Sequence, residues 1–142
     1  MNKEQTVFSQ LMDLIPKHEF NRCVKRYSNN LSPRKFSYWE QFLAMAFAQL
    51  TFRESLRSIE ECLSALDRRT YHMGFRSRVT RSTLADANNQ RDWRIWHDLA
   101  QVLIERARKL YAKEKLDFEF DNIAYALDST TITLCLTLFP WA

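Results

Sequence analysis

The stretch SYWEQFLAMAFAQL, residues 37–50, decides which kind of fold this sequence can form. Its side chains are apolar almost all the way round a helix, and Ser37 followed three residues later by Glu40 is the capping-box pattern that begins a helix. An apolar helix of this kind must be covered by neighbours on most of its surface. We therefore expect residues 38–50 to form the central and most buried helix of the protein.

The composition favours further helices on both sides of this one. The chain has a single Gly and three Pro in 142 residues, and 46% of its residues are hydrophobic. So little Gly and Pro excludes a disulfide-rich scaffold, a collagen-like repeat and a disordered tail. Apolar residues at helical spacing predict helices over residues 7–15, 19–28 and 56–66, with Ser55 capping the last of these.

Two more helices are expected downstream. Ser82 and Thr83 are expected to begin a short helix that ends near Asn88, and a long helix is expected over residues 92–112. Apolar residues recur in the long helix at spacings of three and four, which predicts one seam packed against the bundle. We call this set the α-helical seam; its members are Trp93, Trp96, Ala100, Leu103, Ala107 and Leu110.

Positive charge is concentrated in one part of the chain. The net charge is +4, but residues 1–113 carry 20 basic and 12 acidic side chains. The stretch 68–94 holds seven Arg and no Lys against Asp86 and Asp92. The planar guanidinium of Arg suits phosphates and base edges, so this clustering favours a nucleic-acid partner over an ordinary solvated basic surface.

The Arg-rich connection and the helix after it are the predicted DNA-binding element. Arginine side chains are suited to phosphates, whereas hydroxyl and amide side chains contact phosphates or base edges. The connection between the two neighbouring helices is too long for a strict helix-turn-helix. The predicted DNA-binding residues are Arg76, Arg78, Thr80, Arg81, Ser82, Thr83, Asn88, Asn89 and Arg91, and the alternative surface is Arg22, Lys25, Arg26, Arg34 and Lys35.

The pattern changes after Lys113. Residues 114–121 are a charged linker, and residues 122–142 are rich in β-branched and aromatic side chains with alternating Thr and Leu. This alternation predicts two strands, over residues 123–127 and 131–138, joined near Asp128. An Asp before Ser and Thr is by itself more often a turn former than a ligand.

Two segments together resemble bacterial insertion-sequence transposases of the DDE type. They are YHMGFRSRVTRSTLADANNQRDWRIW, residues 71–96, and YALDSTTITLCLTLFPWA, residues 125–142. The resemblance implies a mainly α chain: an N-terminal helical DNA-binding bundle over residues 1–113, then a β-hairpin that begins an incomplete RNase H-like α/β domain. It also implies that Asp128 is the first catalytic carboxylate and a ligand of Mg²⁺ or Mn²⁺.

On this interpretation the chain is a truncated transposase that binds the terminal inverted repeats of an insertion sequence. One carboxylate cannot hold two metal ions, so we expect the chain alone to bind no metal and to be inactive in DNA cleavage and strand transfer. The expected partner is double-stranded DNA at the transposon ends, with a homodimer as one form of the complex.

Two other functions stay open at this point. One is a free-standing helical DNA-binding protein or regulator that competes for the element ends, and the other is a helical protein-interaction module. No stretch is long and apolar enough for a signal peptide or a membrane span. The cysteines are three in number and none of them forms a C-x-x-C pair. We expect a cytoplasmic, nucleoid-associated bacterial protein with no membrane partner.

Overall fold

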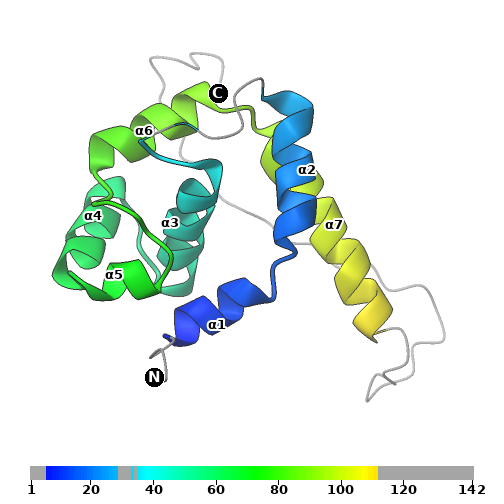
Figure 1. The fold of residues 1–142 in the computed structure, drawn as a ribbon, viewed down its shortest axis with the longest axis horizontal. Coiled ribbons are helices and arrows are strands. Elements are labelled where there is room, and N and C mark those ends of the chain that lie inside the picture. Colours follow the sequence, from blue (N-terminus) through cyan, green and yellow to red (C-terminus); the bar gives the residue numbers. More distant parts are fainter. Residues whose placement is uncertain (1–5, 29–32, 34, 112–142) are drawn as a thin grey trace, which may run out of the picture. The chain divides into compact units, whose positions relative to one another are not determined.

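The computed structural model describes residues 6–28, 33 and 35–111 (Figure 1). These residues form helices joined by short connections. The helices are α1 (Val7–Asp13), α2 (Lys17–Tyr27), α3 (Tyr38–Leu50), α4 (Leu56–Ala65), α5 (Arg69–His72), α6 (Arg81–Gln90) and α7 (Arg94–Tyr111). Contacts divide the chain into one unit of residues 1–111 and another of residues 112–142.

Local capping explains where the central helices begin. The Ser37 hydroxyl accepts a hydrogen bond from the Glu40 amide, and the Glu40 carboxylate accepts one from the Ser37 amide at 2.8 Å. Ser55 caps α4 in the same way, through the amide of Ser58. Both predicted caps are confirmed, because each satisfies amides that the first helical turn leaves without partners.

Helix α3 lies between two apolar clusters, which confirms its predicted central place. One cluster gathers side chains from α1, α3, α4 and α6 with Phe36, Met73, Phe75 and Val79, and the other joins α2 to α7. Trp39 and Phe42 of α3 pack against both clusters. The ring of Phe20 on α2 meets the Trp39 ring edge-on at a centroid distance of 5.2 Å. Burying these large side chains supplies most of the free energy that holds the helices together.

The predicted fold class is wrong in its β part. In the portion of the chain that the structure describes, every regular element is a helix and none is a strand. The two predicted strands, the 114–121 linker and the whole of the predicted domain over residues 122–142 lie outside the described residues. The prediction rested on alternation within one short segment, whereas a stable sheet needs a third strand or a packed face that this pattern does not supply.

Two details of the predicted helices also need correction. Helix α6 begins at Arg81, one residue before the predicted start at Ser82, and its cap is Thr80. In α7 the buried residues are Ile95 and Leu99, which expose 0% and 3% of their surface, and of the predicted seam Trp96 and Leu103 pack against the same cluster. The α-helical seam does not face the bundle along its length, because Trp93 is 68% exposed and Leu110 is 70% exposed.

Candidate nucleic-acid interface

An extended connection leads from α5 to α6 and carries two of the four predicted DNA-binding arginines, Arg76 and Arg78. We call residues 75–80 the strap. Phe75 and Val79 are buried in the cluster around α3, at 2% and 3% exposure, and they anchor the strap at two points. Arg76, Ser77 and Arg78 lie between these anchors with exposed side chains. The apolar anchors therefore hold a short run of basic and hydroxyl residues at the surface.

Two glutamates fix the strap's backbone. The Arg76 amide donates to Oε1 of Glu40 at 3.0 Å, and Glu40 is only 3% exposed. At the other end the Arg81 amide donates to Oε2 of Glu60 at 3.0 Å. A buried carboxylate is tolerated only where donors surround it, and the capping box and the strap provide these donors for Glu40. The strap is thus tied to both α3 and α4.

Gly74 makes the turn before the strap. Its φ of +101° lies in the left-handed region, which only glycine enters without strain. A Cβ built at this position would lie 3.0 Å from Cδ1 of Leu43, whose side chain is fully packed on α3. The single glycine of the sequence therefore sets the direction in which the arginines leave the core.

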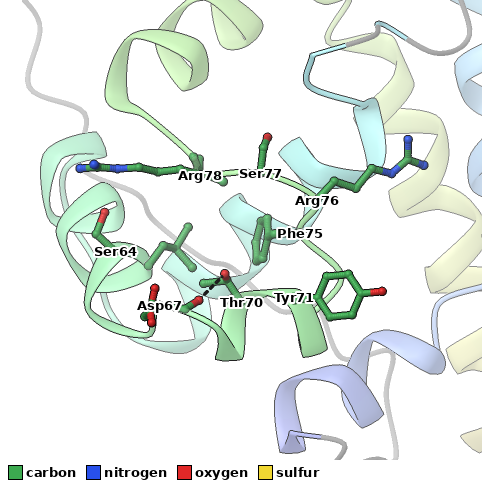
Figure 2. Close-up of a pocket in the computed structure, with 10 residues that line it drawn as sticks. Ser64, Asp67, Thr70, Tyr71, Phe75, Arg76, Ser77 and Arg78 are labelled. Carbon is green, nitrogen blue, oxygen red and sulfur yellow. Dashed lines mark hydrogen bonds between the residues drawn. The ribbon is translucent and has the colours of Figure 1, made fainter.

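A hollow of about 390 Å³ opens between the strap, α4 and α5. Figure 2 shows Arg76 and Arg78 leaving the strap in opposite directions, with Ser77 between them. Arg78 extends toward α4, where Nη2 lies 3.7 Å from Oε1 of Glu60. Hydroxyl groups of Ser64, Thr70, Tyr71 and Ser77 also line the hollow. Asp67 and the apolar Leu63, Phe75 and Val79 complete the lining. The arginines and hydroxyl residues of this wall are of the kinds that contact phosphate oxygens.

The start of α6 continues this surface. Thr80 caps the helix through the amide of Thr83, and the Thr80 hydroxyl also lies 3.1 Å from that of Ser82. Arg81 and Ser82 are exposed. Because the amides of Arg81 and Thr83 already donate to Glu60 and Thr80, the side chains rather than the helix amides are available to a ligand. The predicted residues Arg76, Arg78, Thr80, Arg81, Ser82 and Thr83 therefore lie along the strap and the first turn of α6, with the side chains of Arg76 and Arg78 on opposite sides of the strap.

Two of the predicted residues are engaged elsewhere. The Arg91 guanidinium donates to the carbonyls of Phe36 and Ser37 and to Oε1 of Gln41, and it stacks over the Tyr38 ring at 4.3 Å. Burial lowers the pKa of Arg91 from its ordinary value, although arginine stays charged. Asn88 accepts a hydrogen bond from Nε2 of Gln41 at 2.6 Å. Both side chains fix α6 to α3, while the neighbouring Asn89 is exposed.

The structure adds residues that are not in the predicted set. Asp86 is exposed and is spaced by four and three from the predicted residues Ser82 and Asn89, so the three form one stripe along the outer face of α6. A prediction based on positive charge does not select an acidic residue such as Asp86. Ser77 and Tyr71 were missed because their position depends on how the strap crosses the core, which the sequence pattern does not encode.

The one predicted metal ligand, Asp128, lies outside the described residues. Across residues 6–28, 33 and 35–111, no group of three or more His, Cys, Asp or Glu side chains is arranged to hold a metal ion. Within the same residues no helix combines the length and the hydropathy that a membrane span requires.

Comparison with known proteins gives one match. A family model described as a domain of unknown function, DUF4372, matches residues 3–76. No curated protein and no solved structure matches the chain. The matched region covers α1 to α5 and ends at Arg76, on the strap.

Proposed function

This chain belongs to the DUF4372 family, and from the surface formed by its strap and α6 we propose that it binds double-stranded DNA. The observation that carries this proposal is the exposed edge formed by Arg76, Arg78, Arg81 and Ser82. Its backbone is fixed at both ends by Glu40 and Glu60. Fixing the backbone in advance reduces the conformational entropy that binding would otherwise cost.

The arginines supply the part of binding that does not depend on DNA sequence. Each guanidinium that neutralises a phosphate releases a counterion, so it adds affinity that falls as salt rises. Arg78 is already paired with Glu60, but the 3.7 Å separation and the 71% exposure of its side chain make this a weak pair. A phosphate with two charge-assisted bonds replaces such a partner readily.

The outer stripe of α6 supplies contacts that can distinguish base pairs. Asn pairs with adenine through two hydrogen bonds, Asp accepts a bond from cytosine, and Ser contacts several base edges. Ser82, Asp86 and Asn89 present these groups on one face of a helix, and the major groove is wide enough to admit a helix. We propose that α6 enters the major groove while the strap contacts the adjacent phosphates.

The resemblance to insertion-sequence transposases indicates which DNA the chain would bind. Domains of this family are common in transposase-like proteins. We propose that the chain is the DNA-binding part of such a protein and that it recognises the terminal inverted repeats of a mobile element. The DDE chemistry, with Asp128 as first carboxylate and Mg²⁺ or Mn²⁺ as cofactor, is part of the same proposal.

Fluorescence anisotropy with a labelled duplex that carries the DNA flanking the gene tests the binding proposal. The variant replaces Arg76, Arg78 and Arg81 by Ala, and the matched control replaces Arg22, Lys25 and Lys35, which are equally exposed and belong to the alternative surface. We expect the first triple variant to bind at least tenfold more weakly, because three phosphate contacts are lost, and the control to bind like the wild type.

The two triple variants carry the same change in net charge, so a general electrostatic effect would weaken both equally. Equal losses, or a larger loss in the control, would contradict the proposed surface. Exchange of the flanking DNA for a scrambled duplex of the same length tests the proposed source, and we expect weaker binding to the scrambled sequence.

A further inference from the structure

We propose that α7 is the dimerisation element of this protein and that it pairs in an antiparallel manner with α7 of a second copy of the chain. This inference does not depend on the proposed DNA binding. It rests on the α-helical seam, which is spaced as in a coiled coil. Trp96 and Leu103 of the seam pack against the cluster that joins α2 to α7, whereas its other members, Trp93, Ala100, Ala107 and Leu110, are exposed.

Helix α7 carries two separate apolar faces. Ile95 and Leu99 make up the first, which packs against Phe20, Cys23 and Val24 of α2. The α-helical seam makes up the second, with six members at spacings of three, four, three, four and three. That spacing repeats every seven residues and is the pattern of helices that pair along their length. The first face is therefore covered within the chain, whereas most members of the second face are exposed.

The exposed apolar surface of α7 is large enough to support a dimer. Trp93 and Leu110 of the seam are 68% and 70% exposed, and Ile104 and Tyr111, one turn after the seam residues Ala100 and Ala107, are 43% and 64% exposed. A fully buried aromatic side chain buries about 150–250 Å², so two aromatic and two aliphatic side chains exposed to this degree offer on the order of 500 Å² of apolar surface. A standard interface buries about 800 Å² on each partner and is about 65% apolar in homodimers, which corresponds to a similar apolar area.

A groove beside α7 marks where the second copy lies. It has a volume of about 520 Å³ and is lined by Phe42, Met45 and Ala46 of α3 together with Trp93, Trp96 and Leu103. The first half of the seam lies in this groove, whereas Ala107 and Leu110 lie beyond the residues that line it. In an antiparallel pair, the partner's Leu110 enters the groove beside Trp93. The same contact repeats across a twofold axis, so both grooves are filled.

Charge selects the antiparallel orientation. The last turns of α7 carry Arg106, Arg108 and Lys109 against Glu105 alone, while Asp92 and Asp98 near its start are paired with Arg94 and Arg26. A parallel pair would place the two basic ends side by side. An antiparallel pair in which Trp96 lies opposite Ala107 separates the two copies of Arg108 by about 20 Å along the axis at 1.5 Å per residue, well beyond the screening length of about 8 Å at physiological salt.

Sedimentation equilibrium of the whole 142-residue chain tests the dimer. The test variant is Ala107→Glu and the control is Gln101→Glu, since both residues are exposed on α7 but only Ala107 belongs to the seam. We expect the wild type and the control to dimerise and Ala107→Glu to raise the dissociation constant at least tenfold. A monomeric wild type would overturn the proposal. That result is also the one expected if another segment of the same chain covered the seam. Equal dimerisation of Ala107→Glu would overturn it as well.

Cysteine cross-linking tests the orientation. The antiparallel register places Trp96 opposite the partner's Ala107, whereas the two copies of Ala107 are about 16 Å apart along the axis. We expect the double variant Trp96→Cys, Ala107→Cys to form a covalent dimer on mild oxidation. The single variant Ala107→Cys should stay at the background set by the natural cysteines of the wild type. A covalent dimer from the single variant would overturn the antiparallel arrangement.

Discussion

Arginines from one stretch of sequence serve two regions of this molecule in opposite ways. Arg91 is half-buried between α3 and α6, where three oxygen atoms and two aromatic rings surround its guanidinium. Arg76, Arg78 and Arg81 are exposed beside the start of α6. The comparison shows that charge clustering in a sequence does not separate cations that hold a fold from cations that face a ligand. The hydrogen-bond acceptors around each guanidinium in the structure separate the two kinds.

We expect the largest loss of stability from a substitution in the apolar core that supports both regions. Phe47 is 8% exposed on α3, and its ring meets the Phe8 ring edge-on at 5.9 Å. Phe47→Ala would leave a cavity and should lower the free energy of unfolding by about 3–5 kcal/mol. Urea denaturation followed by circular dichroism measures this loss. A midpoint equal to that of the wild type would contradict the central place given to α3.

Arg91→Ala sharpens the comparison directly. It leaves the carbonyls of Phe36 and Ser37 without their charged donor, so we expect a loss of about 2–3 kcal/mol in the free energy of unfolding. DNA affinity, measured at a temperature where the variant is folded, should stay within twofold of the wild type. If the variant kept its stability but bound DNA more weakly, Arg91 would be a DNA contact and not a residue that holds α6 to α3.

Asn89→Ala separates recognition of bases from contact with phosphates. Loss of one bidentate base contact should reduce discrimination between the flanking DNA and a scrambled duplex by about 1–3 kcal/mol. Stability should not change, because Asn89 is exposed. Asn88→Ala is the matched control, since Asn88 bonds to Gln41 and should affect stability instead. If Asn88→Ala lost discrimination between the two duplexes and Asn89→Ala did not, α6 would present a different face to DNA.

Glu60→Gln should have the smallest effect and the opposite sign. Glu60 holds Arg78 and accepts from the Arg81 amide, and Gln keeps an oxygen for the amide but loses the charge. Arg78 is then released for phosphate, so DNA affinity should rise by about two- to fivefold, as expected for a weak exposed pair. Competition binding against the wild type measures the change, and weaker binding would show that Glu60 itself supports the interface.

Local signals made much of the fold predictable. The caps at Ser37 and Ser55 depend on residues three positions apart, and the apolar surface of α3 implied its central place. The packing of α7 was not predictable, because its two apolar faces are alternatives until the position of α2 is known. The same holds for Arg91, whose acceptors lie about fifty residues away in sequence. The sequence predicted which residues of the strap are basic or carry hydroxyl groups, but not the path by which the strap crosses the core.

The most direct test of the account is the salt dependence of DNA binding by the wild type and by the Arg76, Arg78 and Arg81 triple variant. Each phosphate contact contributes about 0.9 to the slope of log K against log salt, so the account predicts that the triple variant's slope is smaller by about three units. The titration covers about 50 to 200 mM salt, where such slopes are well determined. Equal slopes for the two proteins would show that these arginines do not contact phosphates and would contradict the proposed interface.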